Sequence, residues 1–84
     1  MSKINYFKDL YMKKIAIAAE MENSILKFKN VKYNIDKIYV SPYTNEHFAR
    51  VSELKNPRNV FNIGLNFDYD KMTFVSNGLM EIPM

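Results

Sequence analysis

Apolar and polar residues recur with the period of an α-helix over the first 24 residues of the chain. At 3.6 residues per turn the apolar side chains fall on one arc of about half the circumference. They are Tyr6, Phe7, Leu10, Tyr11, Ile15, Ile17, Ala18 and Met21, while Asp9, Lys13 and Glu20 take the opposite side. This arc is wider than packing on one small sheet requires. The pattern predicts a long helix that contacts either two elements of its own fold or a second chain.

Lys14 falls in the middle of this apolar arc, which admits two interpretations. In the first, its aliphatic stem lies along apolar surface while the ammonium group reaches water. In the second, this face of the helix is partly open and Lys14 marks a binding surface.

The period changes to two after the helix. Val31, Tyr33 and Ile35 alternate with polar residues, which predicts a strand over residues 31–41 that residues 25–29 can pair with. The alternation from Phe61 to Phe67 is the clearest strand signal in the chain. Residues 68–71 then predict a turn before a return strand, and residues 77–78, Asn-Gly, predict a second tight turn.

A short second helix is predicted between these strands, over residues 45–55. Pro42 ends the preceding strand because it cannot donate to a ladder. Thr44 is a candidate N-cap, and the three-residue spacing of Phe48, Val51 and Leu54 suits one helical face. The resulting fold class is α+β in two layers. The long N-terminal helix and the short second helix pack on an antiparallel sheet of about four strands, in a single domain over residues 1–84.

No group of residues suggests catalysis, a cofactor or a bound metal. The chain has no cysteine, which excludes disulfides, thiolate ligands and a cysteine nucleophile. His47 is the only histidine, so neither a typical zinc site nor a triad is expected, and we predict an ordinary surface or half-buried side chain. Asp68 and Asp70 are best explained as turn formers. Gly64 and Gly78 lie too far apart for a phosphate-binding loop. We therefore predict a protein that is not an enzyme.

The positive charge is concentrated in the N-terminal half. Residues 1–42 carry eight Lys against four acidic residues, a net charge of +4, whereas residues 43–84 carry a net charge of −1. A surplus of this kind attracts anionic partners. Lys, Asn, Ile, Tyr and Phe, which have A/T-rich codons, make up 40 of the 84 residues and predict a phage or mobile-element gene. No stretch approaches the roughly 20 apolar residues of a membrane span, so we expect a cytoplasmic protein without a membrane partner.

The candidate binding residues are five lysines with one aromatic residue as a possible anchor: Lys14, Lys27, Lys29, Lys32, Lys37 and Tyr39. Lysines neutralise phosphates and aromatic rings stack on unpaired bases, so the segment from residue 27 to 39 suits RNA better than DNA. The same lysines also suit an acidic protein surface.

Three hypotheses follow for the function. The first is a small non-enzymatic binding protein that inhibits or modulates a host or defence factor through a basic surface. The second is an RNA- or DNA-binding regulator that uses the strand from residue 27 to 39. The third is a structural subunit that forms a homo-oligomer, for instance a dimer, through the N-terminal helix or the C-terminal strand.

Overall fold

The computed structural model describes residues 3–82, with side chains from residue 6 onward. Its elements are the helix α1 (Lys3–Met21) and the strands β1 (Ile25–Phe28), β2 (Val31–Tyr39), β3 (Glu46–Glu53), β4 (Val60–Asp68) and β5 (Thr73–Glu81). The strands form one antiparallel sheet in the order β1-β2-β3-β4-β5. The predicted α+β class, the long N-terminal helix and the antiparallel sheet are confirmed, and the sheet has one strand more than predicted.

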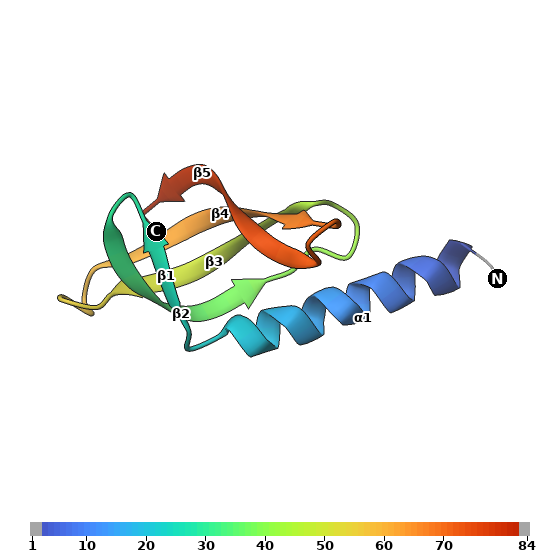
Figure 1. Cartoon of the computed structure of the whole chain (residues 1–84), viewed down its shortest axis with the longest axis horizontal. Helices are drawn as coiled ribbons and strands as arrows, with labels where there is room; N and C mark the ends of the chain where they lie inside the picture. Colours follow the sequence, from blue (N-terminus) through green and yellow to red (C-terminus); the bar gives the residue numbers. More distant parts are fainter. Residues whose placement is uncertain (1–2, 83–84) are drawn as a thin grey trace.

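The sheet curls around the helix like half of a barrel (Figure 1). Helix α1 contacts both β2 and β5, although β3 and β4 lie between these two strands in the sheet. The curl of the sheet and the packing of α1 bury apolar side chains on the inner face of the sheet, and these side chains form the core. The core residues are Ala18, Phe28, Tyr33, Ile35, Ile38, Ala49, Val51, Ile63, Leu65, Phe67 and Phe74. None of the described elements forms a second layer on the outer face of the sheet.

The predicted second helix is wrong, because residues 46–53 form strand β3. His47, Ala49 and Val51 are buried and alternate with exposed residues along this strand. A histidine and an alanine occupy two of the three inward positions, so the alternation was hidden from a count of strongly apolar residues. Phe48 and Leu54, which supplied the apparent helical spacing, are exposed.

Residues 77 and 78 do not form the predicted tight turn. Strand β5 continues through them, and its pairing with β4 shifts register between Ile63 and Leu65. Gly78 has a φ of 88°, a conformation that glycine adopts without strain. Asn77 and Gly78 therefore form a bulge that bends β5.

The predicted β4–β5 hairpin is present, and residues 25–28 form a strand paired with β2, which was one of the possibilities left open for this segment. Lys29 and Asn30 connect β1 to β2 with φ values of 50° and 67°, as a two-residue type I′ turn requires. Between β4 and β5, Asp68 Oδ1 accepts hydrogen bonds from the backbone N–H groups of Asp70 (2.9 Å) and Lys71 (3.1 Å). The predicted turn-forming role of this aspartate is confirmed.

Only the C-terminal end of α1 is tied closely to the sheet. The helix ends at Met21, and Asn23 follows it with a φ of 68° and an N–H that donates to the carbonyl oxygen of Ile35 on β2 (2.7 Å). The N-terminal end of α1 runs beyond the sheet (Figure 1). The radius of gyration is 13.6 Å, against about 11.9 Å for a compact domain of this length. The overhanging helix accounts for the elongated shape.

Candidate binding surfaces

Most of the predicted basic residues lie on the outer face of the sheet. Lys27 and Lys32 are cross-strand partners and both are exposed. Farther along β2, Lys37 is the cross-strand partner of Arg50. Lys29 lies at the β1–β2 turn, with its Nζ 5.4 Å from the centroid of the neighbouring Phe28 ring. The structure thus places two pairs of like charge on one face.

The two cationic pairs do not form a continuous strip. Lys32 and Lys37 are five residues apart, which corresponds to roughly 16 Å along a strand. Asp36 lies between them, and its Oδ1 accepts hydrogen bonds from Asn34 Nδ2 (2.9 Å) and Ser52 Oγ (3.2 Å). A carboxylate therefore separates the pairs.

Tyr39 belongs to an aromatic pair on this outer face. Its ring stacks on Phe48 of β3, with centroids 4.6 Å apart and an interplanar angle of 25°. The Nζ of Lys37 lies 5.1 Å from the Tyr39 ring centroid. Both rings are partly open to solvent. The predicted anchor thus has a neighbour, Phe48, that the sequence had assigned to a helix.

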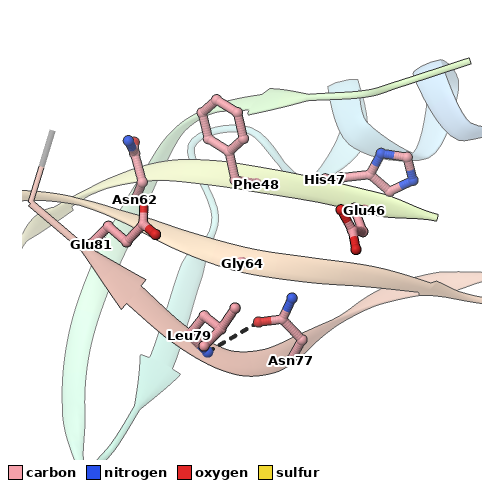
Figure 2. A pocket seen from close by; sticks show the side chains of 8 residues that line it. All are labelled: Glu46, His47, Phe48, Asn62, Gly64, Asn77, Leu79 and Glu81. Carbon is pink, nitrogen blue, oxygen red and sulfur yellow. Dashed lines mark hydrogen bonds between the residues drawn. The ribbon is translucent and has the colours of Figure 1, made fainter. Parts of the chain in front are cut away.

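A depression of about 490 Å³ adjoins this pair on the outer face. Figure 2 shows Gly64 on its floor, with Glu46 and Glu81 on either side. The side chain of Asn77 covers Gly64 so closely that a Cβ at residue 64 would lie 2.4 Å from Asn77 Oδ1. Two carboxylates at its walls make this depression unfavourable for phosphate groups.

Lys14 lies on the inner side of the sheet, away from the other four lysines. It is 4% exposed, and its Nζ lies 5.4 Å from the Phe67 ring centroid and 5.2 Å from that of Tyr69. The ammonium group thus lies over two aromatic faces. Lys14 therefore contributes nothing to a basic outer surface.

His47 is buried close to Lys14, not at the surface or half-buried as predicted. The N–H of Ser41 donates to its Nδ1 (3.0 Å), so the imidazole proton resides on Nε2. Among the described residues, this buried Nε2 has no hydrogen-bond partner. Burial lowers the pKa of His47 below 6.5, and the positive charge of Lys14 lowers it further. Both effects favour the neutral form of the side chain at pH 7.

A second surface lies between the overhanging part of α1 and the β2–β3 loop. It is a groove of about 470 Å³, lined by Phe7, Lys8, Tyr11, Pro42 and Tyr43, which we call the aromatic groove. Four of these residues also line a smaller adjoining pocket of about 90 Å³. Lys14, Asn45 and Tyr69 are among its other walls, and we call it the Lys14 pocket.

The β2–β3 loop is held in place by its own hydrogen bonds. Ser41 Oγ accepts from the N–H groups of Tyr43 and Thr44, both at 3.3 Å. Asn45 Oδ1 accepts from the N–H of Phe67 on β4 (3.1 Å). Tyr43 is 94% exposed at the tip of this loop. An ordered loop thus presents a large aromatic ring to solvent.

Sequence reasoning missed the loop side of the aromatic groove. Because a helix was predicted to begin after Thr44, Pro42 and Tyr43 were not predicted to line a binding site. An aromatic residue between a proline and a threonine in a loop was the available signal. On the helix side, Phe7 and Tyr11 were part of the predicted arc, and its excess width indicated a second contact.

Within residues 3–82, no cluster of three or more histidine, aspartate or glutamate side chains could hold a metal ion. The described helix is not long and apolar enough to cross a membrane. Comparisons with protein-family models, curated proteins and solved structures find no significant match.

Proposed function

We propose that this chain is a non-enzymatic binding protein that docks a segment of a partner protein in the aromatic groove and modulates the partner by occupying its surface. The observation that carries the proposal is the uncovered groove itself. Phe7 lies on the core-facing side of α1 but is 57% exposed, and Tyr43 is 94% exposed opposite it. Tyr6 packs edge-on against the Phe7 ring, with centroids 5.7 Å apart, yet more than half of Phe7 and nearly all of Tyr43 are open to solvent.

Exposed aromatic side chains grouped in this way are typical of protein interfaces. Large contiguous apolar patches are uncommon on the surfaces of monomers and mark interaction sites. Tyrosine is enriched among the residues that dominate binding energy. Since the β2–β3 loop is already ordered by Ser41 and Asn45, little conformational entropy is lost when a partner binds.

The charge of the groove indicates an acidic partner. Lys8 lies at the groove and Lys14 lines the adjoining pocket, whereas neither cavity is lined by an aspartate or glutamate. A complementary segment therefore carries negative charge beside apolar residues. The predicted phage or mobile-element origin makes a host or defence protein the first class of partner to test.

Affinity capture from the organism that carries the gene, followed by reconstitution with the purified partner, tests the proposal. We expect Phe7→Ala and Tyr43→Ala each to weaken binding by roughly 10-fold to 30-fold, as truncated interface anchors do. Met12→Ala is the matched control, because Met12 is an exposed apolar residue on α1 that does not line the groove. If Phe7→Ala and Tyr43→Ala bind the partner as tightly as the wild type and Met12→Ala do, the proposal is contradicted. A groove-dependent dimer of the chain itself, detected by light scattering, contradicts the assignment of a different protein as partner.

A separate observation on the outer face favours nucleic-acid binding as a second candidate. Directly opposed like charges destabilise a sheet, yet Lys27 faces Lys32 and Lys37 faces Arg50. We propose that these pairs would contact phosphates of a single strand whose bases stack beside Tyr39. The interrupting Asp36 and the two acids of the neighbouring depression make this the weaker candidate.

Fluorescence anisotropy with labelled single-stranded and duplex RNA and DNA tests this second candidate. Affinity should fall steeply as salt rises, because binding releases counterions. The double variant Lys27→Glu/Lys32→Glu should lose binding, whereas Lys71→Glu, an exposed lysine in the β4–β5 turn, should change it only modestly. Absence of binding to every probe at low salt rules this candidate out.

A further inference from the structure

Lys14 is an almost fully buried residue whose charge is not balanced by a described acidic side chain. Among the described side chains, no Asp or Glu forms an ion pair with Lys14, and its ammonium lies over the rings of Phe67 and Tyr69. Transfer of a charge from water into a protein interior is costly unless it is paired. The two aromatic faces offset part of that cost. A carboxylate that paired with the cation would offset more of it.

The Lys14 pocket has the size and the walls to admit such a group. Its volume is about 90 Å³, whereas a water molecule occupies roughly 30 Å³. Its walls include Phe7, Tyr11, Tyr43 and Tyr69, with the polar side chains of Thr44 and Asn45 beside them. A carboxylate that enters from the aromatic groove would meet the buried cation in a largely apolar setting, where the interaction is stronger than in water.

We infer that the Lys14 pocket receives an aspartate or glutamate side chain of the partner segment, which pairs with the Lys14 ammonium while flanking apolar residues fill the aromatic groove. This inference rests on the proposed protein-docking function and names the chemistry that the site selects. Lys14 is then the residue that determines specificity, and the aromatic rings supply most of the contact area.

A random peptide library displayed on phage, selected on the purified full-length chain, provides a probe that does not depend on knowing the partner. We expect the enriched peptides to share an acidic residue next to an aromatic or aliphatic one. Synthetic peptides from the selection are then measured by fluorescence anisotropy. Replacement of the shared Glu by Gln should weaken binding to the wild-type chain about 30-fold or more, as loss of one partner of a buried charge pair does.

The matching change in the protein is Lys14→Met, which removes the cation and keeps an unbranched apolar side chain. It should weaken the acidic peptide by a similar factor, and the Glu and Gln peptides should then bind equally, as a double-mutant cycle shows for two groups in direct contact. Lys13→Met is the control, since it removes the same charge from an exposed position on α1. If Lys14→Met fails to fold, the Glu/Gln comparison on the wild-type chain decides alone.

The outcomes separate this inference from the proposed function. Peptides that require Tyr43 but bind equally well with Glu or Gln would overturn the carboxylate assignment and leave the docking groove intact. An absence of enriched peptides, or peptides that bind Tyr43→Ala and Phe7→Ala as well as wild type, would overturn both. Peptides that depend on both Tyr43 and the shared Glu would support both.

Discussion

The two halves of helix α1 carry the same sequence pattern and have opposite surroundings. Phe7, Lys14 and Met21 follow one another at seven-residue intervals and therefore lie along a single stripe of the helix. Toward the C-terminus this stripe packs on the sheet, and Ala18 beside it is buried. Toward the N-terminus the stripe continues past the sheet and Phe7 is open to solvent. Helical periodicity sets the direction in which side chains point, whereas the extent of the sheet decides whether anything covers them.

The largest expected effect comes from placing a charge in the covered half. Ala18→Asp buries a carboxylate in the core, which should lower the free energy of unfolding by about 3–5 kcal/mol or prevent folding. Ala16→Asp makes the same change two residues away at an exposed position, and should cost about 0.5 kcal/mol through helix propensity. Urea denaturation followed by circular dichroism measures both. Similar losses would show that the two sides of α1 do not differ as described.

Lys14, at the boundary between the halves, should respond in the opposite direction. Lys14→Met removes an unpaired buried charge, so the free energy of unfolding should not fall and should rise by up to about 2 kcal/mol. Removal of the nearby positive charge should also raise the pKa of His47. Denaturation and NMR titration of the imidazole measure the two effects. A clear loss of stability would mean that the lysine is structural and not held at a cost for binding.

The third effect is a dependence of stability on pH that originates at His47. Burial and the nearby charge of Lys14 lower the pKa of its imidazole in the folded chain below the ordinary value of 6.5. As the pH is lowered through this range, the unfolded state therefore binds more protons than the folded state. The free energy of unfolding decreases as the pH is lowered, until the pH passes below the folded pKa. The slope is at most about 1.4 kcal/mol per pH unit. Denaturation from about pH 7.5 down to about pH 5 measures it, and His47→Gln should flatten this part of the profile.

The smallest effect is expected in the uncovered half. Phe7→Ala removes a large apolar side chain that is mostly exposed, so the free energy of unfolding should change by no more than about 0.5 kcal/mol. A core phenylalanine truncated in the same way costs about 3–5 kcal/mol, and Phe67→Ala is the matched control. A loss from Phe7→Ala that approaches the core value would show that the aromatic groove is closed in solution.

Much of the fold was predictable because its patterns are local. The helical arc of α1 and the alternation along β2 and β4 depend on neighbouring residues alone. Strand β3 was missed because Ala49 and His47 occupy core positions that only the curled sheet makes apolar. His47 fits there through one hydrogen bond from the Ser41 N–H and an edge contact with Phe74 at 5.3 Å.

The site was less predictable because it depends on tertiary geometry. Clustered lysines between residues 27 and 37 were visible in the sequence, but Lys37 lies beside Arg50 on the outer face because the β2–β3 pairing shifts register between Ile35 and Lys37. The aromatic groove arises from the length of α1 relative to the sheet and from the position of Tyr43. Neither quantity leaves a periodic signal in the chain.

The bulge at Asn77 and Gly78 has a consequence for how this chain can associate. Strand β5 is one of the two edges of the sheet, and a straight exposed edge is a template onto which another chain can add a strand. The bulge bends that edge and interrupts its regular ladder, while the opposite edge strand β1 is only four residues long. Both margins are thereby protected against aggregation by strand addition. The proposed docking in the aromatic groove uses side chains and needs neither edge of the sheet.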